Sequence, residues 1–182
     1  MEVFGNQKNC GGSTPPQLGS WLEGDWSRPV LLVTKVFSNN QTEVKLMPIL
    51  GKRSLEVLAT CHPSLQMIIQ EAIRVFDFTV VCGRRGEKEQ EKAFREGKSK
   101  LHYPESKHNA ETPTLSKAVD LAPYRDGKIQ WDDREAFVFL AGVMKAIAMT
   151  KGVPLRWGGD FNRNDNLHDD KFVDYPHFEL ES

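Results

Sequence analysis

Three short stretches of the chain carry side chains that could assemble into one metal site. They are Ser106-Lys107-His108, Ala118-Val119-Asp120 and Asp174-Tyr175-Pro176-His177. Two imidazoles and one carboxylate make three protein ligands, the number typical of a catalytic zinc because its fourth position stays open for water. Asp174 lies three residues before His177 and is a further carboxylate that could act as a base on that water. These residue types favour a hydrolase over a fold that a metal merely stabilises.

The sequence around each candidate leaves alternatives open. Asp120 lies in an apolar run, where a carboxylate is costly unless it binds a metal, forms a buried ion pair or caps a neighbouring loop. On a strand, His177 and Glu179 share one face, which fits either a cleft wall or an exposed edge. His108 lies in a polar loop without comparable context. His168, in another polar loop, is a rival ligand or a residue that lines the cleft.

Composition excludes several classes of protein. Lys and Arg total 24 against 25 Asp and Glu, so the chain lacks the basic excess of a nucleic-acid binder and we expect no nucleic-acid partner. The apolar run Val30-Leu31-Leu32-Val33 is too short to span a bilayer, and the first residues lack a secretory signal. We therefore expect no membrane insertion and a cytoplasmic protein. The three cysteines match no zinc ribbon, and Cys82 is expected to be a buried free thiol.

Patterning divides the 182 residues into two parts. Residues 1–50 are predicted to be an N-terminal extension, made of a flexible arm and a β-hairpin at 30–37 and 42–49. Residues 51–182 are predicted to be the catalytic domain. Its strands are expected at 78–82, 117–123, 154–157 and 177–180, and its helices at 64–76, 87–96 and 132–150.

The order of these elements predicts the fold class. Helices and strands are mixed without regular βαβ alternation, so we expect an α+β fold: a small antiparallel sheet flanked by helices, with the zinc site in a cleft on the sheet. Ser64 is the expected N-cap of the first helix, and Asp132 begins the last one. Gly97 and Gly152 are the expected helix ends.

Taken together, the motifs resemble those of one family of enzymes. Ser106-x-His108, the A-V-D-L run at 118–121, the W-G-G-D-F run at 157–161 and the P-H-F-E-L run at 176–180 resemble the zinc peptidases of the D-Ala-D-Ala carboxypeptidase family. Within it, the chain is most similar to the L-alanyl-D-glutamate peptidases that serve as bacteriophage endolysins. The resemblance covers roughly residues 52 to 182.

The resemblance implies a role for particular residues. Zinc is expected on His108, Asp120 and His177, with Asp174 as the base. Arg85, in Gly83-Arg84-Arg85, is expected to stabilise the oxyanion or to grip a substrate carbonyl or carboxylate. Ser106, Gln90 and His168 are further candidates for substrate contact.

The chain departs from the family pattern at three points, none of which removes a ligand. Eleven residues separate His108 from Asp120, a longer interval than in many relatives, and residues 112–114 are expected to loop out. Ser116 and Gly86 stand where the family frequently has glycine and Thr or Ser, respectively.

The implied activity is zinc-dependent hydrolysis of the L-alanyl-D-glutamate bond in peptidoglycan stem peptides. The resemblance further implies a monomeric endolysin that stays in the cytoplasm of the infected bacterium until a holin releases it to the cell wall. A D-Ala-D-Ala dipeptidase or carboxypeptidase, and a non-catalytic zinc-containing binding module of the same fold, are the alternatives. Retention of both Asp174 and Arg85 argues against the binding module.

Overall fold

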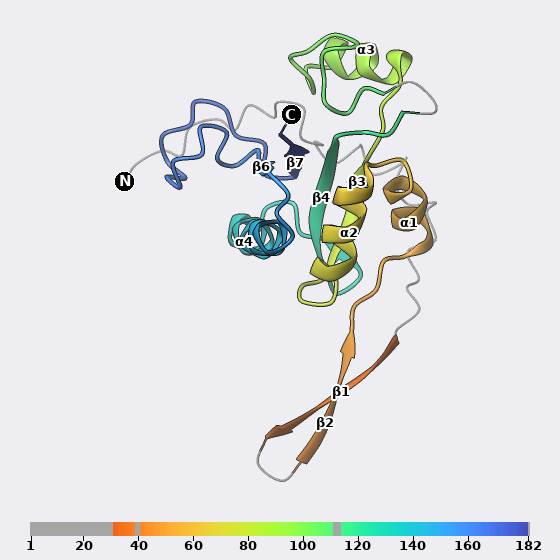
Figure 1. The fold of residues 1–182 in the computed structure, drawn as a ribbon, viewed down its shortest axis with the longest axis vertical. Coiled ribbons are helices and arrows are strands. Elements are labelled where there is room, and N and C mark those ends of the chain that lie inside the picture. Colours follow the sequence, from red (N-terminus) through yellow and green to blue (C-terminus); the bar gives the residue numbers. More distant parts are fainter. Residues whose placement is uncertain (1–30, 39–40, 111–113, 182) are drawn as a thin grey trace.

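A small antiparallel sheet forms the centre of the molecule (Figure 1). The computed structural model describes residues 31–38, 41–110 and 114–181. The sheet has the strand order β3-β4-β7-β6, and β5 pairs with the far end of β4. These strands span Phe78–Cys82 (β3), Ala118–Arg125 (β4), Lys128–Ile129 (β5), Leu155–Trp157 (β6) and His177–Leu180 (β7). The predicted α+β fold with a small antiparallel sheet is confirmed.

Helices α2 and α4 pack against each other and cover one face of this sheet. The four helices in the described part of the chain span Lys52–Leu58 (α1), Pro63–Ala72 (α2), Glu87–Arg95 (α3) and Arg134–Thr150 (α4). Leu65 and Ile69 of α2 are fully buried with Leu140 and Met144 of α4. Burial of each such large apolar side chain contributes about 1.5–3 kcal/mol, so this layer anchors the sheet.

Alternation along the central strands separates the two faces of the sheet. Val119 and Leu121 of β4 and Phe178 of β7 belong to the hydrophobic core under α2 and α4. Because successive side chains of a strand point to opposite faces, Asp120 and His177 lie on the other face. The sheet thus carries its core on one side and its chemically active residues on the other.

Most helix ends differ from the predicted ones by one or two residues, but α2 ends at Ala72, four residues before the predicted end at residue 76. His62, rather than Ser64, is the N-cap of α2, because its Nδ1 accepts a hydrogen bond from the Ser64 amide at 3.2 Å. Asp133, rather than Asp132, caps α4 through the Ala136 amide at 2.9 Å. Helix α1 was not predicted, since its N-cap Gly51 offers no side-chain signal.

A separate two-stranded antiparallel sheet precedes the main one. It consists of β1 (Leu31–Ser38) and β2 (Gln41–Met47), and it extends away from the main sheet in Figure 1. The predicted hairpin is therefore present, whereas the arm predicted for residues 1 to about 20 and most of the expected loop at 112–114 lie outside the described residues. The domain boundary at residue 50 stays a prediction. Among the described helices, none is both long and apolar enough to cross a bilayer.

Candidate active site

Strand pairing brings two of the predicted ligands together. Asp120 of β4 and His177 of β7 are direct partners across the antiparallel pair, so their side chains lie on the same face. His108 reaches them from the connection between α3 and β4. All three side chains are nearly inaccessible to solvent.

The three side chains present one atom each to a common point. His108 Nε2 lies 3.2 Å from Asp120 Oδ1 and 3.1 Å from His177 Nδ1, and His177 Nδ1 lies 3.2 Å from Asp120 Oδ1. Ligand atoms of a tetrahedral zinc stand about 3.3 Å apart when their bonds to the metal are about 2.0 Å. The triangle therefore has the size of one face of a tetrahedral metal site.

Hydrogen bonds fix the proton of each histidine away from this point. His108 Nδ1 lies 2.7 Å from the Gly83 carbonyl oxygen, which can only accept, so Nδ1 carries the proton and Nε2 presents a lone pair. His177 Nε2 lies 3.0 Å from Glu179 Oε2, which leaves Nδ1 as the lone-pair atom. Two lone pairs and a carboxylate oxygen thus face one another, an arrangement that a bound cation stabilises.

The electrostatics of the centre also favour positive charge. Burial disfavours ionised Asp120, yet the neighbouring His108 and His177 hold the pKa of its carboxyl well below the usual range. Burial likewise opposes charge on His108, but Asp120 raises the pKa of that imidazole well above its ordinary value. Burial also opposes charge on His177, yet its hydrogen bonds to Asp120 and Glu179 raise the pKa of that imidazole.

Glu179 and Arg156 support His177 from behind. Arg156 Nε donates to Glu179 Oε1 at 3.0 Å, and its Nη2 donates to the same oxygen. Although burial acts in the opposite direction, the bonds from His177 and Arg156 lower the pKa of Glu179 to about 2. Arg156 was not predicted as a site residue. The feature that identifies Arg156 is its position directly opposite Glu179 in the β6–β7 pair. The sequence alone does not reveal this pairing.

Cys82 offers a second set of three donors. Its sulfur, a His108 nitrogen and an Asp120 oxygen all lie within 4.8 Å of one another. The sulfur is 3.9 Å from His108 Nδ1, however, and that nitrogen is engaged by Gly83. The set of His108, Asp120 and His177 is therefore favoured, since it uses the free nitrogen of each ring.

The prediction that Cys82 is a free thiol is confirmed, but the prediction that it is buried was wrong. The residue is partly exposed and lies beside the centre, where its sulfur accepts from Arg85 Nη2 at 3.6 Å. A register shift between Val80 and Cys82 explains the change, because it makes Cys82 the direct partner of Asp120 on the active face.

Close packing around residue 83 explains why the Gly83-Arg84-Arg85 motif begins with glycine. A Cβ at this position would lie 2.5 Å from Thr60 Oγ1 and 2.8 Å from Cys61 Sγ. The backbone can therefore pass this close only without a side chain. This close packing fixes the carbonyl that orients His108.

Asp174 stands in the same pocket with a free oxygen. Its Oδ1 is buried without a hydrogen-bond partner. Burial, followed by the nearby negative charge of Asp120, raises the pKa of Asp174 to about 7. Its backbone is held tightly, because its amide donates to the Gly158 carbonyl at 2.6 Å and a Cβ on Gly158 would lie 2.4 Å from the Asp174 carbonyl.

Arg85 lies beside the centre and is only 14 % exposed. Its Nη2 is 3.8 Å from Asp120 Oδ2, and its Nη1 donates to Gln90 Oε1 at 3.1 Å. The same Gln90 oxygen accepts from Asn109, and Gln90 Nε2 donates to Ser99 and to the Leu101 carbonyl. Gln90 is fully buried behind Arg85 and outside the pocket wall, so its position supports Arg85 instead of providing the expected substrate contact.

The other two candidates for substrate contact have different positions. Ser106 lines the pocket, and its hydroxyl accepts from the His108 amide at 3.3 Å. His168 is exposed in the loop before β7 and does not line this pocket. The structure therefore does not bring His168 to the centre as a rival ligand.

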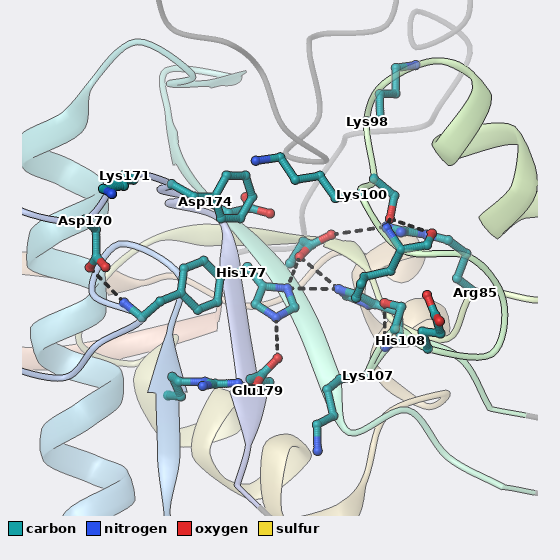
Figure 2. A pocket seen from close by; sticks show the side chains of 18 of the residues that line it. Arg85, Lys98, Lys100, Lys107, His108, Asp170, Lys171, Asp174, His177 and Glu179 are labelled. Carbon is teal, nitrogen blue, oxygen red and sulfur yellow. Dashed lines mark hydrogen bonds and ion pairs between the residues drawn. The ribbon is translucent and has the colours of Figure 1, made fainter.

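A cavity of about 700 Å³ opens over the centre (Figure 2). Phe161 and Phe172 form part of its wall, together with residues 98–101 from the opposite side. Its size suits a short stretch of peptide or a ligand of similar bulk. A buried three-donor centre, a carboxylate with a raised pKa and an arginine in one cleft define a candidate hydrolase that acts on a carbonyl group.

Comparisons with known proteins agree with this class. The family model described as phage L-alanyl-D-glutamate peptidase matches residues 47–181. The L-alanyl-D-glutamate peptidase of Escherichia phage T5 is 36% identical over 123 residues, which are 66% of this chain and 86% of that protein. The chain therefore belongs to the phage L-alanyl-D-glutamate peptidase family, and the predicted family and peptidase class are confirmed.

A solved structure shares the fold. The crystal structure of the Serratia marcescens L-Ala D-Glu endopeptidase ChiX matches with a TM-score of 0.59 and 27% sequence identity. The match covers 73% of this chain and 90% of the Serratia protein. The common part therefore includes nearly the whole of that endopeptidase.

Proposed function

We propose that this protein is a zinc-dependent peptidoglycan hydrolase that cleaves the L-alanyl-D-glutamate bond of stem peptides. The bond specificity is supported by family membership and by the named activities of the T5 and Serratia proteins. The observation that carries the metal dependence is the triangle of donor atoms 3.1–3.2 Å apart, with both ring protons directed away from it.

His108, Asp120 and His177 would hold the zinc. Two imidazoles and one carboxylate are a donor set that suits zinc and leaves a fourth position open. The chemistry that a zinc ion supplies when bound is Lewis acidity toward water and toward a peptide carbonyl. Glu179 and the Gly83 carbonyl keep the two rings in the tautomers that this role requires.

Asp174 and Arg85 perform the remaining steps. Asp174 takes a proton from the attacking water and returns it to the leaving amine, and a pKa of about 7 suits both directions of transfer near neutral pH. Bound metal favours the ionised carboxylate, which is the form that accepts the proton. Arg85 keeps its charge throughout and donates to the oxygen of the reacting carbonyl, where negative charge develops.

The experiment that tests this function is digestion of purified stem-peptide fragments, with the products identified by mass spectrometry. We expect a cut between L-alanine and D-glutamate that is lost on chelation and restored by zinc. Loss of only a terminal D-alanine would instead indicate the dipeptidase or carboxypeptidase alternative. Unchanged activity after complete metal removal, verified by elemental analysis, would contradict the zinc dependence.

We also propose that the protein is a monomer that acts on the cell wall of an infected bacterium after holin-type release from the cytoplasm. Membership of a phage peptidase family supports this setting. Expression in bacteria with and without a pore-forming holin tests it, since lysis is expected only with the pore. Lysis without the pore would contradict the release step, and a dimeric mass in solution would contradict the monomer.

A further inference from the structure

Three of the cations in the wall of the pocket are already engaged by other protein groups. Arg85 contacts Asp120 and Gln90, and Arg156 is bound to Glu179. Lys98 Nζ lies 2.7 Å from Glu96 Oε2. These three cations are thus held by protein partners before any substrate arrives.

Lys100 is held differently. It is exposed, and its Nζ lies 4.2 Å from the centroid of the Phe172 ring, across the pocket from its own loop. A cation over an aromatic face is oriented by the ring, yet it keeps its full charge. Lys100 can therefore still attract an anion, unlike a lysine that is already paired with a carboxylate.

Aromatic contacts connect this ammonium group to the catalytic centre. Phe172 stacks on Phe161 with 5.5 Å between ring centroids, and Phe161 lies 6.1 Å from the His177 ring. In Figure 2, the Lys100 side chain extends over the pocket toward the segment that carries Asp174. Lys100 thus presents its charge on the catalytic side of the pocket.

The proposed substrate has an anion close to the bond that is cut. A glutamyl residue has two carboxyl groups, of which one continues the peptide and the other stays free. The free carboxylate is separated from the scissile amide by only a few bonds. A cation that is pre-oriented in the wall of the same pocket would match this group.

We infer that Lys100 binds the free carboxylate of the glutamyl residue and so determines specificity for an acidic residue after the scissile bond. This inference rests on the proposed function. Lys100 is a specificity residue in this account, because the proton transfers are assigned to Asp174.

The test compares two synthetic peptides that differ at one group. One carries the free carboxylate on its glutamyl residue, and the other carries a carboxamide at that position. We expect Lys100→Met to lower kcat/KM for the carboxylate peptide by about 3–10-fold, mainly through a higher KM. The kcat/KM for the carboxamide peptide should change by less than about twofold. Lys100→Arg is expected to keep the preference.

Lys98→Met is the matched control, because Lys98 lines the same pocket but is paired with Glu96. Lys98→Met is expected to change kcat/KM by the same factor for both peptides. If Lys100→Met lowered kcat/KM equally for the two peptides, or left it unchanged for the carboxylate peptide, the inference about Lys100 would be overturned. The proposed function would still stand. If the wild-type enzyme left the carboxylate peptide uncut, the proposed function would fail and the inference with it.

Discussion

The two halves of the catalytic centre are held in different ways. Asp120 and His177 are direct partners on neighbouring strands, so the backbone ladder of the sheet fixes their separation. His108 and Arg85 lie on connecting segments, which are joined by an isolated bridge between Arg85 and Asn109. We call these the strand half and the loop half.

In the loop half, hydrogen bonds of the side chains fix the geometry, in place of backbone pairing between strands. His108 is oriented by the Gly83 carbonyl and Arg85 by Gln90. We therefore expect the strand half, together with His108, to control metal binding, whereas Arg85 and Gln90 of the loop half adjust turnover. Substitutions in the two halves should therefore produce different defects.

The largest effect is expected from Asp174→Asn, which removes the base without touching either half. Loss of a general acid-base residue lowers turnover by about 10²–10⁴-fold. Zinc content should be unchanged, because Asp174 is outside the donor triangle. A stopped assay measures turnover, and elemental analysis measures the zinc content. Asp169→Asn, in the same pocket wall, is the control, and wild-type turnover in Asp174→Asn would remove Asp174 from the mechanism.

Glu179→Gln weakens the strand half. The neutral amide no longer offers His177 a charged acceptor, so the favoured tautomer and the basicity of the ring are both reduced. We expect zinc affinity to fall about 10–100-fold, and turnover at saturating zinc to fall much less. Competition with a chromogenic chelator measures the affinity. Wild-type affinity in this variant would show that the support of His177 is dispensable.

Gln90→Ala weakens the loop half. It removes the acceptor of Arg85 Nη1 and the donor to Ser99, so the guanidinium should lose its fixed position. We expect about a tenfold lower kcat/KM, within the cost of losing one or two hydrogen bonds, with zinc affinity close to that of the wild type. A circular-dichroism spectrum checks that the variant is folded. A folded variant with poor zinc affinity and normal turnover would reverse the comparison of the two halves.

The smallest effect concerns the folding of the metal-free protein. The folded-state pKa of Asp174, about 7, is above the ordinary value of 3.8, so the folded state binds more protons between these values and stability falls as pH rises through them. Asp174→Asn removes the titrating carboxyl group, and with it this loss of stability at higher pH. We expect its melting temperature to exceed that of the wild type by roughly 3–6 °C at pH 8 and to be nearly equal at pH 4. A larger difference at pH 4 than at pH 8 would contradict the burial of this carboxylate.

Sequence reasoning was most successful for the strand half. Period-two alternation separates Val119 and Phe178 from Asp120 and His177, and the structure has these pairs on opposite faces. The same pattern put Glu179 beside His177. Local spacing is sufficient here, because strand geometry depends on neighbouring residues.

The loop half could not be derived in the same way. The contact between His108 and the Gly83 carbonyl joins positions 25 residues apart, and no periodicity connects them. Gln90 looked like a substrate residue because it follows the arginine motif, but its helix turns it into the interior. Cys82 was misjudged because a bulge reversed its expected face.

The donor set is tested most directly by zinc X-ray absorption spectroscopy on the zinc-loaded wild-type protein. We predict about one zinc per chain, with only nitrogen and oxygen neighbours at about 2.0–2.2 Å and an imidazole signature from two histidines. Cys82→Ser should give the same spectrum. A sulfur neighbour at about 2.3 Å would show that Cys82 replaces His177, and the absence of stoichiometric zinc would contradict the proposed centre.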